Sequence, residues 1–305
     1  MNNSYINLKA QIDSIMKHCN EKSYKTRYRY YEATTQFIKF AGEHYHLQKF
    51  ANTSSKHIIA YTEYMKAQGL SPATIKCNLA GVRFFYRHSN GKNVLIDNSK
   101  LDLQQREFGK INRAWLPAEI EKGIAVARAM GRLDIEQALK FGAYWGCRCS
   151  EICTLRVSDI LLCAEQKELK ITGKGGKTRY VQMTTPAQEK TIKEAIEYAK
   201  EHNLSRTDRL IVDSTKGGVQ RGRRSIQNWI NNNYHKFIIA DRQAYITGDK
   251  VRTEKLTCHG LRASFAQSLY GELKEAKPSI TDKEAREKVS HSLGHNRISV
   301  TTCYL

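Results

Sequence analysis

The C-terminal stretch Leu293-Gly294-His295 through Thr301-Thr302-Cys303-Tyr304-Leu305 decides how the rest of this sequence is interpreted. Tyr304 stands nine positions after His295 and directly before the last residue, at the end of a strongly basic chain. Three earlier segments each carry a polar or charged group suited to holding a phosphate. They are Gly146-Cys147-Arg148-Cys149-Ser150-Glu151, Gly173-Lys174-Gly175 and His259-Gly260-Leu261-Arg262. These four segments hold the candidate residues for chemistry.

The composition indicates a folded protein with a polyanionic partner. Of its 305 residues, 40% are hydrophobic and 26% are charged, which is typical of a globular chain and not of a disordered one. The formal net charge is +20, and both halves of the chain are basic. This distribution favours a body that faces nucleic acid over a protein with a basic tail.

The sequence gives no sign of membrane insertion or secretion. It has no run of about 18 apolar residues, and Met1-Asn2-Asn3-Ser4 does not begin a signal peptide. Eight cysteines without such a signal predict reduced thiols in a cytosol. Cys147, Cys149 and Cys153 have no second matching pair, so we interpret them as small buried thiols and not as zinc ligands.

Residues 1–88 are expected to form a small helical domain that rests on DNA phosphates. Ser23 and Ser71-Pro72 are helix-start signals, and a further helix is expected from Ser55 to Gln68. Basic residues alternate with tyrosines or lie off the apolar stripe of these helices. The candidates for DNA contact in this domain are Lys25, Arg27, Lys76, Arg83 and Arg87.

Residues 89–113 are predicted to be a linker, because turn-forming residues recur there without periodicity. Residues 114–305 are predicted to be a second domain, mainly helical with a small β-sheet, so the fold class is α+β. The expected elements are helices up to about residue 156, a hairpin of strands 168–172 and 178–183, a strand at 210–212, a helix capped by Ser225, and helices at 259–271 and 282–293. Arg221, Arg223 and Arg224 precede the Ser225 cap and are further DNA-binding candidates.

The candidate catalytic residues have side chains suited to a phosphodiester. Arg148 and Arg262 carry planar, permanently charged guanidinium groups that pair with phosphate oxygens through two parallel hydrogen bonds. His259 lies one helical turn before Arg262 and offers an imidazole that binds oxygen or moves a proton near neutral pH. Lys174 sits between glycines at the hairpin tip, where an ammonium is able to protonate a leaving oxygen.

Two apparent motifs are rejected. The Gly-Lys-rich hairpin resembles a phosphate-binding loop, but Ile171 replaces its first glycine and no helix pattern follows. His291 and His295 are four residues apart, but Ser292 stands where a metalloprotease motif has glutamate. No carboxylate cluster indicates magnesium. We therefore expect no metal and no cofactor.

Taken in order, Arg148, Lys174, His259-x-x-Arg262, His295 and Tyr304 resemble the active-site set of the tyrosine recombinases, the phage integrase family. The local context matches as well: G-x-R-x-x-E, G-K-G-x-K, H-x-L-R, and L-G-H with a tyrosine nine residues later. The resemblance covers nearly the whole chain, because the family places a helical, SAM-like core-binding domain before its catalytic domain.

The resemblance implies a mechanism. Tyr304 would attack the scissile phosphate and form a 3′-phosphotyrosyl link, which conserves the bond energy without ATP or metal. Arg148, Arg262 and His259 would bind the phosphate oxygens, with His295 assisting. Lys174 would be the general acid for the 5′ oxygen, and Glu151 would orient its neighbours.

The resemblance also implies partners and a setting. The expected partner is double-stranded DNA with specific recombination sites, on which four protomers exchange strands through a Holliday junction, with or without accessory DNA-bending or directionality factors. A cytoplasmic, nucleoid-associated protein of a bacterium, phage or other mobile element is expected. Family members usually continue past the nucleophile with a tail that docks on a neighbouring protomer. This sequence stops at Leu305, so that contact is not carried over.

Two other functions share some of these features. A type IB topoisomerase uses similar groups to relax DNA, and a non-catalytic protein would occupy DNA sites without cutting them. The two-domain layout and the L-G-H motif favour recombination over relaxation. Residues Lys274–Lys283 are expected to form an inserted loop between Arg262 and His295.

Overall fold

The chain folds into two compact units, Met1–Glu107 and Phe108–Leu305, and each is described by itself. The structure is a computed structural model that describes residues 3–105, 111–239, 242, 251–294 and 301–305. For Lys174 and Val251 only the backbone is described. None of the described helices is both long enough and apolar enough to cross a membrane.

The first unit is a helical bundle, as predicted. Ser23 and Ser71 cap their helices by accepting hydrogen bonds from the backbone N–H groups of Thr26 and Thr74. Helices α2 and α4 pack against each other, and α1 covers α2. The helices are α1 (Asn3–His18), α2 (Tyr24–Tyr45), α3 (Ser55–Ala67) and α4 (Pro72–Arg87), with short 3-10 turns η1 (Phe50–Asn52) and η2 (Asn98–Lys100).

Part of the segment expected to be a linker belongs to the first unit. Leu101 lies in the core of that unit, and Leu95, Ile96 and Leu103 pack against it. These apolar residues recur at neither helical nor strand spacing, which explains why the sequence alone indicated only turns. The division between the two compact units falls further along the chain, between residues 107 and 108.

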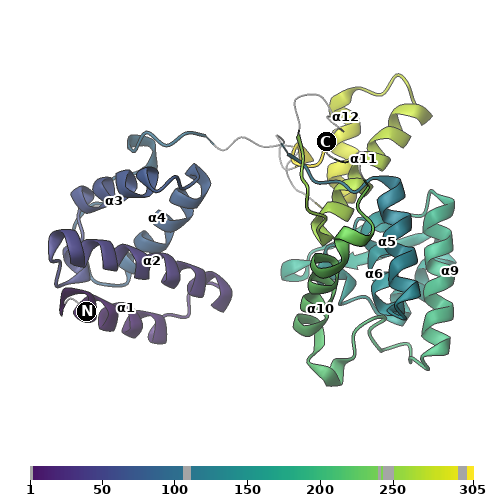
Figure 1. The fold of residues 1–305 in the computed structure, drawn as a ribbon, viewed down its shortest axis with the longest axis horizontal. Helices are drawn as coiled ribbons and strands as arrows, with labels where there is room; N and C mark the ends of the chain where they lie inside the picture. Colours follow the sequence, from purple (N-terminus) through teal and green to yellow (C-terminus); the bar gives the residue numbers. More distant parts are fainter. Residues whose placement is uncertain (1–2, 106–110, 240–241, 243–250, 295–300) are drawn as a thin grey trace. The chain divides into compact units, whose positions relative to one another are not determined.

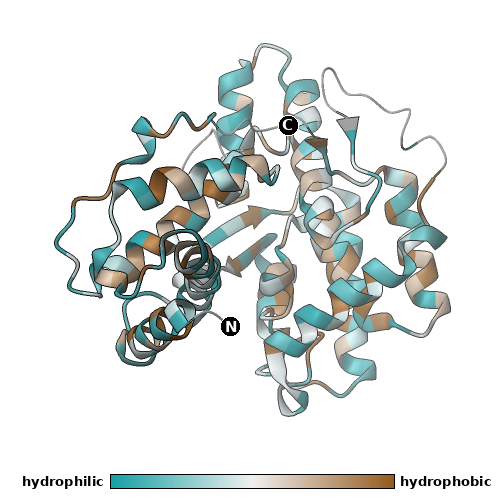
Figure 2. Cartoon of the chain, turned by 60° about the vertical axis from the view of Figure 1, so that its left-hand side comes forward, coloured by the Kyte–Doolittle hydropathy of each residue, from teal (hydrophilic) through white to brown (hydrophobic). Residues whose placement is uncertain are grey.

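The second unit is built around helix α6, which packs against α5, α7, α9, α10 and α11. Figure 1 shows α6 between its neighbours, and Figure 2 shows that the helices are amphipathic, with hydrophobic and hydrophilic residues on different faces. The helices are α5 (Pro117–Ala129), α6 (Leu133–Trp145), α7 (Cys149–Ile152), α8 (Val157–Gln166), α9 (Pro186–Glu201), α10 (Gly218–Asn233), α11 (Cys258–Ala276) and α12 (Asp282–Ser292). The 3-10 turns are η3 (Lys174–Gly176), η4 (Ser214–Lys216) and η5 (Tyr234–Lys236).

Two small sheets accompany these helices. Strands β2 (Glu168–Thr172) and β3 (Thr178–Gln182) form the predicted antiparallel hairpin, with Ile171 paired to Arg179. Strands β1 (Ile111–Asn112) and β4 (Val251–Arg252) form a parallel pair that the sequence did not predict. The mainly helical α+β class is confirmed.

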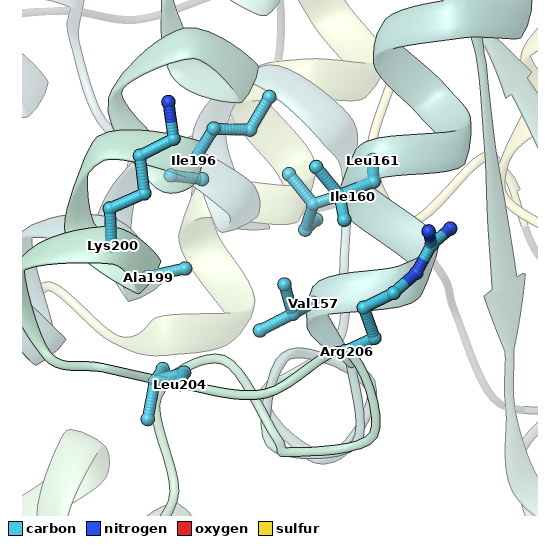
Figure 3. Close-up of a pocket in the computed structure, with 9 residues that line it drawn as sticks. Val157, Ile160, Leu161, Ile196, Ala199, Lys200, Leu204 and Arg206 are labelled. Carbon is cyan, nitrogen blue, oxygen red and sulfur yellow. The ribbon is translucent and has the colours of Figure 1, made fainter.

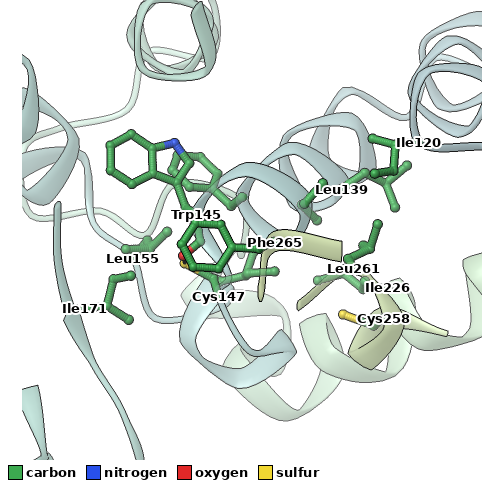
Figure 4. Close-up of a cluster of buried hydrophobic side chains, with 14 of the residues drawn as sticks. Ile120, Leu139, Trp145, Cys147, Leu155, Ile171, Ile226, Cys258, Leu261 and Phe265 are labelled. Carbon is green, nitrogen blue, oxygen red and sulfur yellow. Dashed lines mark hydrogen bonds between the residues drawn. The ribbon is translucent and has the colours of Figure 1, made fainter. Parts of the chain in front are cut away.

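The core of the second unit fixes the turn between α6 and α7. Gly146 ends α6 in the left-handed conformation, with φ +61°, and an added Cβ would lie 2.4 Å from Phe265. Trp145 and Cys147, on either side of this glycine, are fully buried (Figure 4). Only glycine fits the turn, and the turn presents Arg148 at the start of α7.

Three local predictions are wrong. Residues 210–212 are not a strand: Leu210 and Val212 are buried in a loop, where the Leu210 N–H donates to the carbonyl of Leu155. Ser225 does not cap a helix, because α10 already starts at Gly218 and Ser225 accepts a hydrogen bond from Arg132 instead. The expected loop Lys274–Lys283 is shorter than predicted, since α11 continues to Ala276 and α12 starts at Asp282, which leaves residues 277–281 as the connection.

Candidate active site

Tyr304 and His259 meet in the structure. The Tyr304 Oη lies 3.2 Å from His259 Nε2, and the two ring centroids are 5.4 Å apart. His259 is held in place by the first turn of α11, whose cap Thr257 accepts a hydrogen bond from the Gly260 N–H. Tyr304 is 7% exposed and belongs to the core cluster of the second unit. The two residues singled out by the H-x-L-R and terminal-tyrosine motifs are therefore direct neighbours.

Glu151 is the centre of the arginine cluster. Its Oε1 lies 2.6 Å from Arg148 Nη1, and its Oε2 accepts the backbone N–H of Arg148 at 2.7 Å. These two bonds explain the G-x-R-x-x-E spacing, because a carboxylate three residues after Arg148 caps the start of α7. Arg262 Nη1 is 3.8 Å from Glu151 Oε2. The structure thus brings Arg148, Glu151 and Arg262 together.

A third arginine, Arg179, completes this cluster, although the sequence analysis did not single it out. It comes from β3, and its Nη2 lies 2.8 Å from Glu151 Oε2. Its position on the strand was a usable signal. Arg179 alternates with Val181 on the buried face of β3, where an arginine requires a partner.

The cluster is strongly electropositive. Burial by itself raises the pKa of Glu151, but the bond and charge of Arg179, together with the bonds from Arg148, outweigh it and lower that pKa to about 2. Burial, followed by repulsion from Arg148 and Arg179, lowers the pKa of Arg262 to about 10. Arg262 therefore remains charged at neutral pH. Three guanidinium groups share one carboxylate, and an anion in the cluster would relieve their repulsion.

The pKa of His259 is lowered, which favours a neutral ring. The residue is exposed at the surface, but the protein atoms around the ring still desolvate it, and Arg262, Arg113 and Arg148 repel a positive charge there. Both effects lower the pKa of His259, with desolvation the larger. A neutral imidazole with Nε2 facing Tyr304 is able to accept the phenol proton.

The positions of Lys174 and His295 are described only in part. Lys174 begins the turn η3 at the tip of the hairpin, as predicted, and its side chain lies outside the described part of the chain. Gly173 brings this hairpin against the cluster, because a Cβ there would lie 3.0 Å from Glu151 Oε1. His295 lies outside the described residues. The residue two positions earlier, Leu293, accepts a hydrogen bond at its carbonyl from Arg262 Nη2.

Gln267 is another residue that sequence reasoning missed. It lies on α11, further along the helix that carries His259 and Arg262, and its Nε2 donates to the backbone carbonyl of Tyr304 at 2.7 Å. The same Nε2 is 3.1 Å from Asn112 Oδ1 on β1. No motif marks a glutamine that binds a backbone atom, so sequence gave no signal for it.

The DNA-binding candidates of the first unit fall into two groups. Lys25 and Arg87 are exposed, and Arg27 is half-buried beside Tyr24. Lys76 and Arg83 instead bind their own unit: Lys76 donates to the carbonyl of Gln104 at 3.0 Å, and Arg83 donates to Asn98 Oδ1 at 2.8 Å and to the carbonyl of Ile96 at 2.6 Å.

The candidates of the second unit lie on one helix. Arg221, Arg223 and Arg224 are all within α10 and not before it. Arg221 and Arg224 are exposed, while Arg223 is half-buried and its carbonyl accepts a weak hydrogen bond from the Cys149 thiol.

Neither the cavities nor the metal-type side chains compete with this site. A cavity of about 180 Å³ between α8 and α9 is mainly apolar, with Lys200 and Arg206 at its edge, and holds none of the predicted catalytic residues (Figure 3). A second cavity, of about 410 Å³, lies between β3, α9 and α11 and likewise holds none of them. Among the described residues, no group of three or more histidines, cysteines or carboxylates is placed to hold a metal ion.

Similar folds are found among solved structures. The XerH site-specific recombinase bound to its difH substrate, in a pre-cleavage complex, is 20% identical with a TM-score of 0.61, over 97% of this chain and 80% of that one. A lambda integrase (75–356) dimer bound to a COC′ core site is 16% identical with a TM-score of 0.64, over 97% and 94%. A lambda integrase tetramer bound to a Holliday junction is 14% identical with a TM-score of 0.61, over 97% and 76%. At these identities the likeness shows the fold.

Family models match both units. The model described as the phage integrase N-terminal SAM-like domain matches residues 9–95, and the model of the phage integrase family matches residues 117–305. Among curated proteins, none is similar enough to count as a relative. The family match spans more than half of the chain, including the cluster around Glu151 and the Tyr304–His259 pair. The chain therefore belongs to the phage integrase family and is, by that membership, a tyrosine site-specific recombinase.

Proposed function

We propose that this recombinase cuts and rejoins DNA strands through a 3′-phosphotyrosyl intermediate on Tyr304. The observation that carries the proposal is the contact of the Tyr304 hydroxyl with His259 Nε2, beside a cluster of three arginines on one carboxylate. A nucleophile, a base and a phosphate pocket stand together, as covalent catalysis on a phosphodiester requires.

His259 serves as the proton acceptor for Tyr304. Because its pKa is lowered, the imidazole is neutral near pH 7, with Nε2 able to accept the phenol proton as Tyr304 attacks phosphorus. The bond from phosphorus to the 5′ oxygen breaks, and the 5′ oxygen takes a proton. The hairpin that starts at Gly173, against Glu151, carries Lys174, which we assign as the donor of that proton.

Arg148 and Arg262 hold the phosphate oxygens. Two guanidinium groups match the added negative charge of a pentacoordinate phosphorus better than the single charge of the ground state, so they lower the barrier. Glu151 orients Arg148 through its bonds to the side chain and the backbone. His295 assists at the phosphate. The chemistry conserves the energy of the phosphodiester in the protein–DNA link, so no step consumes ATP.

Double-stranded DNA with specific sites is the proposed partner. The solved structures with the same fold include a recombinase on its substrate and an integrase tetramer on a Holliday junction. We assign the same kind of partner and a tetrameric assembly to this chain. The first compact unit, Met1–Glu107, is the proposed core-binding domain, and the second, Phe108–Leu305, carries the proposed catalytic site. Exposed basic side chains supply the phosphate contacts: Lys25, Arg87, Arg221 and Arg224.

The test captures the covalent intermediate. The protein is mixed with sheared DNA from its source organism, the reaction is stopped with detergent, and DNA attached to protein is recovered and sequenced. Adducts at one or a few loci, with the nucleotide mapped to Tyr304 by mass spectrometry, are expected for wild type. Tyr304→Phe should form none while still binding DNA.

A matched control is Tyr270→Phe, which removes a phenol on α11 that binds Asp282 and not His259. It should form adducts like wild type. Adducts scattered over all sequences would support a type IB topoisomerase instead. Adducts that persist in Tyr304→Phe, or an absence of adducts from wild type that binds DNA, would reject the proposed mechanism.

A further inference from the structure

Arg179 is a buried cation for which the mechanism above has no role. Its side chain is 6% exposed, and it stands on β3 opposite Ile171, at a strand position that alternation assigns to the core. A guanidinium in such a place loses much of its hydration and is retained only where its partners compensate. Its partners therefore indicate what it does.

Both acceptors of Arg179 are shared with Arg262. Arg179 Nη2 donates to Glu151 Oε2 at 2.8 Å and to the carbonyl of Gly146 at 3.3 Å. Arg262 Nη1 also donates to the carbonyl of Gly146, and it lies 3.8 Å from Glu151 Oε2. Arg179 therefore forms a hydrogen bond to Glu151 Oε2, whereas Arg262 is too far from this oxygen to form one.

Glu151 Oε2 also accepts the backbone N–H of Arg148, so with Arg179 it has two donors at hydrogen-bond distance. A carboxylate oxygen offers about two lone-pair positions, and both are then occupied. If Arg179 were absent, Arg262, with Nη1 only 3.8 Å from Oε2, would be close enough to take the vacant position. A direct Arg262–Glu151 pair would draw the Arg262 guanidinium toward the carboxylate and lower its availability to phosphate.

We propose that Arg179 is a positioning residue that occupies Glu151 and so keeps Arg262 available to bind the scissile phosphate. It also contacts the Leu293-Gly294 segment, because a Cβ on Gly294 would lie 3.0 Å from Arg179 Cδ. Arg179 acts on Arg262 through Glu151, so its role requires no contact with DNA. The inference rests on the proposed function, since it assigns Arg262 to a phosphate.

The first test compares cleavage rates. The probe is a nicked duplex built on the locus recovered by covalent capture, and the single-turnover rate of adduct formation is measured alongside DNA affinity. Arg179→Lys keeps the charge but not the planar guanidinium, whose Nη2 reaches both Glu151 and the Gly146 carbonyl, and we expect a rate about 10- to 100-fold lower, with DNA affinity within about twofold of wild type. The control is Arg242→Lys, another buried arginine paired to a glutamate, Glu119, at 2.6 Å.

The second test separates competition for Glu151 from a general loss of structure. Arg179→Met leaves Glu151 open to Arg262, so cleavage should fall at least as far as in Arg179→Lys. Adding Glu151→Gln to Arg179→Met removes the competing charge, and we expect the double variant to cleave about tenfold faster than Arg179→Met. It also removes the uncompensated buried carboxylate, so it should fold even if Arg179→Met does not. A double variant no faster than the single one would overturn the proposal.

A structural measurement decides the inference without reference to activity. In a crystal structure of Arg179→Met, or of Arg179→Lys if the former does not fold, the Arg262 Nη1–Glu151 Oε2 separation should shorten from 3.8 Å to a direct hydrogen bond. An unchanged separation rejects the role of Arg179 whether or not the protein cleaves DNA. Absence of adducts from wild type, in contrast, rejects the proposed function and leaves this measurement valid.

Discussion

The arginines of the two units are used in different ways. In the first unit, Arg83 and Arg29 are half-buried and donate to neutral oxygens of their own unit. In the second unit, Arg148, Arg179 and Arg262 converge on the single carboxylate of Glu151. The pKa of Arg262 is lowered mainly by burial and then by the other two arginines.

This difference separates two functions of positive charge that composition reports as one. A basic residue bound to a carbonyl of its own unit stabilises the fold, whereas a group of arginines with too few carboxylates is complementary to an anion. The +20 net charge indicated nucleic acid, and the local arrangement of the arginines marks the place that we propose for the phosphate chemistry. The following predictions test this contrast, in order of decreasing effect.

Arg262→Gln should lower the single-turnover cleavage rate by about 10³-fold, because it removes a charged donor at the transition state from a buried site. The rate is measured on the captured site, with folding checked by thermal unfolding. Arg242→Gln, which removes a buried arginine of the same unit, should retain the wild-type rate after correction for folded protein. If Arg262→Gln lowers the rate less than tenfold, Arg262 does not bind the scissile phosphate.

His259→Gln should lower the cleavage rate by about 10²- to 10⁴-fold and change its pH dependence. The pKa of His259 is lowered, so its ring is neutral at pH 7 and gains a proton only as the pH falls below its ordinary value of 6.5. Wild-type cleavage should therefore decline on the acid side, below that value, and the variant should lack this decline. Rates are measured from about pH 5 to about pH 8. If the cleavage rate of His259→Gln still declines at acid pH, another group is responsible for the decline.

Gln267→Glu should lower cleavage by about tenfold while leaving DNA affinity unchanged. The change keeps the shape of the side chain but replaces a donor with a carboxylate oxygen facing the carbonyl of Tyr304 and Asn112 Oδ1. The control is Gln166→Glu, at the exposed end of α8. Equal rates in both variants would show that Gln267 does not position the nucleophile.

Arg87→Gln and Arg83→Gln form a matched pair on α4 with the smallest expected effects. Arg87 is exposed, so its loss should reduce the slope of DNA affinity against salt concentration by about one and leave the melting temperature unchanged. Arg83 binds Asn98 and Ile96, so its loss should lower the melting temperature and leave the salt slope nearly unchanged. The reverse result would invert the assignment of these two residues.

Much of the site follows from sequence because its motifs are local. The G-x-R-x-x-E spacing is a helix cap, and H-x-L-R places His259 and Arg262 on one helix, so both are visible in short windows. Gln267 and Arg179 act through partners more than 25 residues away, which no short pattern reports. The motifs assigned His259 and Tyr304 to one site, but the direct contact between them became visible only in the fold.

The errors in the fold have a common cause. Leu210 and Val212 are apolar because they fill the core beside Leu155, and a short apolar run does not distinguish a buried loop from a strand. Helix α10 starts before its basic residues because Gly217, with φ +90°, turns the chain into it, while Ile226 and Trp229 hold its inner face. In both cases packing, and not local preference, determines the outcome.

The Gly146 turn has one further consequence. It ends α6, whose aligned peptide dipoles place about half a negative charge at that end, and its carbonyl accepts from both Arg179 and Arg262. A helix terminus attracts these cations as a second carboxylate would, but it has no proton to gain at low pH and no flexible side chain to follow a departing phosphate. The pocket therefore holds its arginines together while keeping the excess positive charge that DNA neutralises.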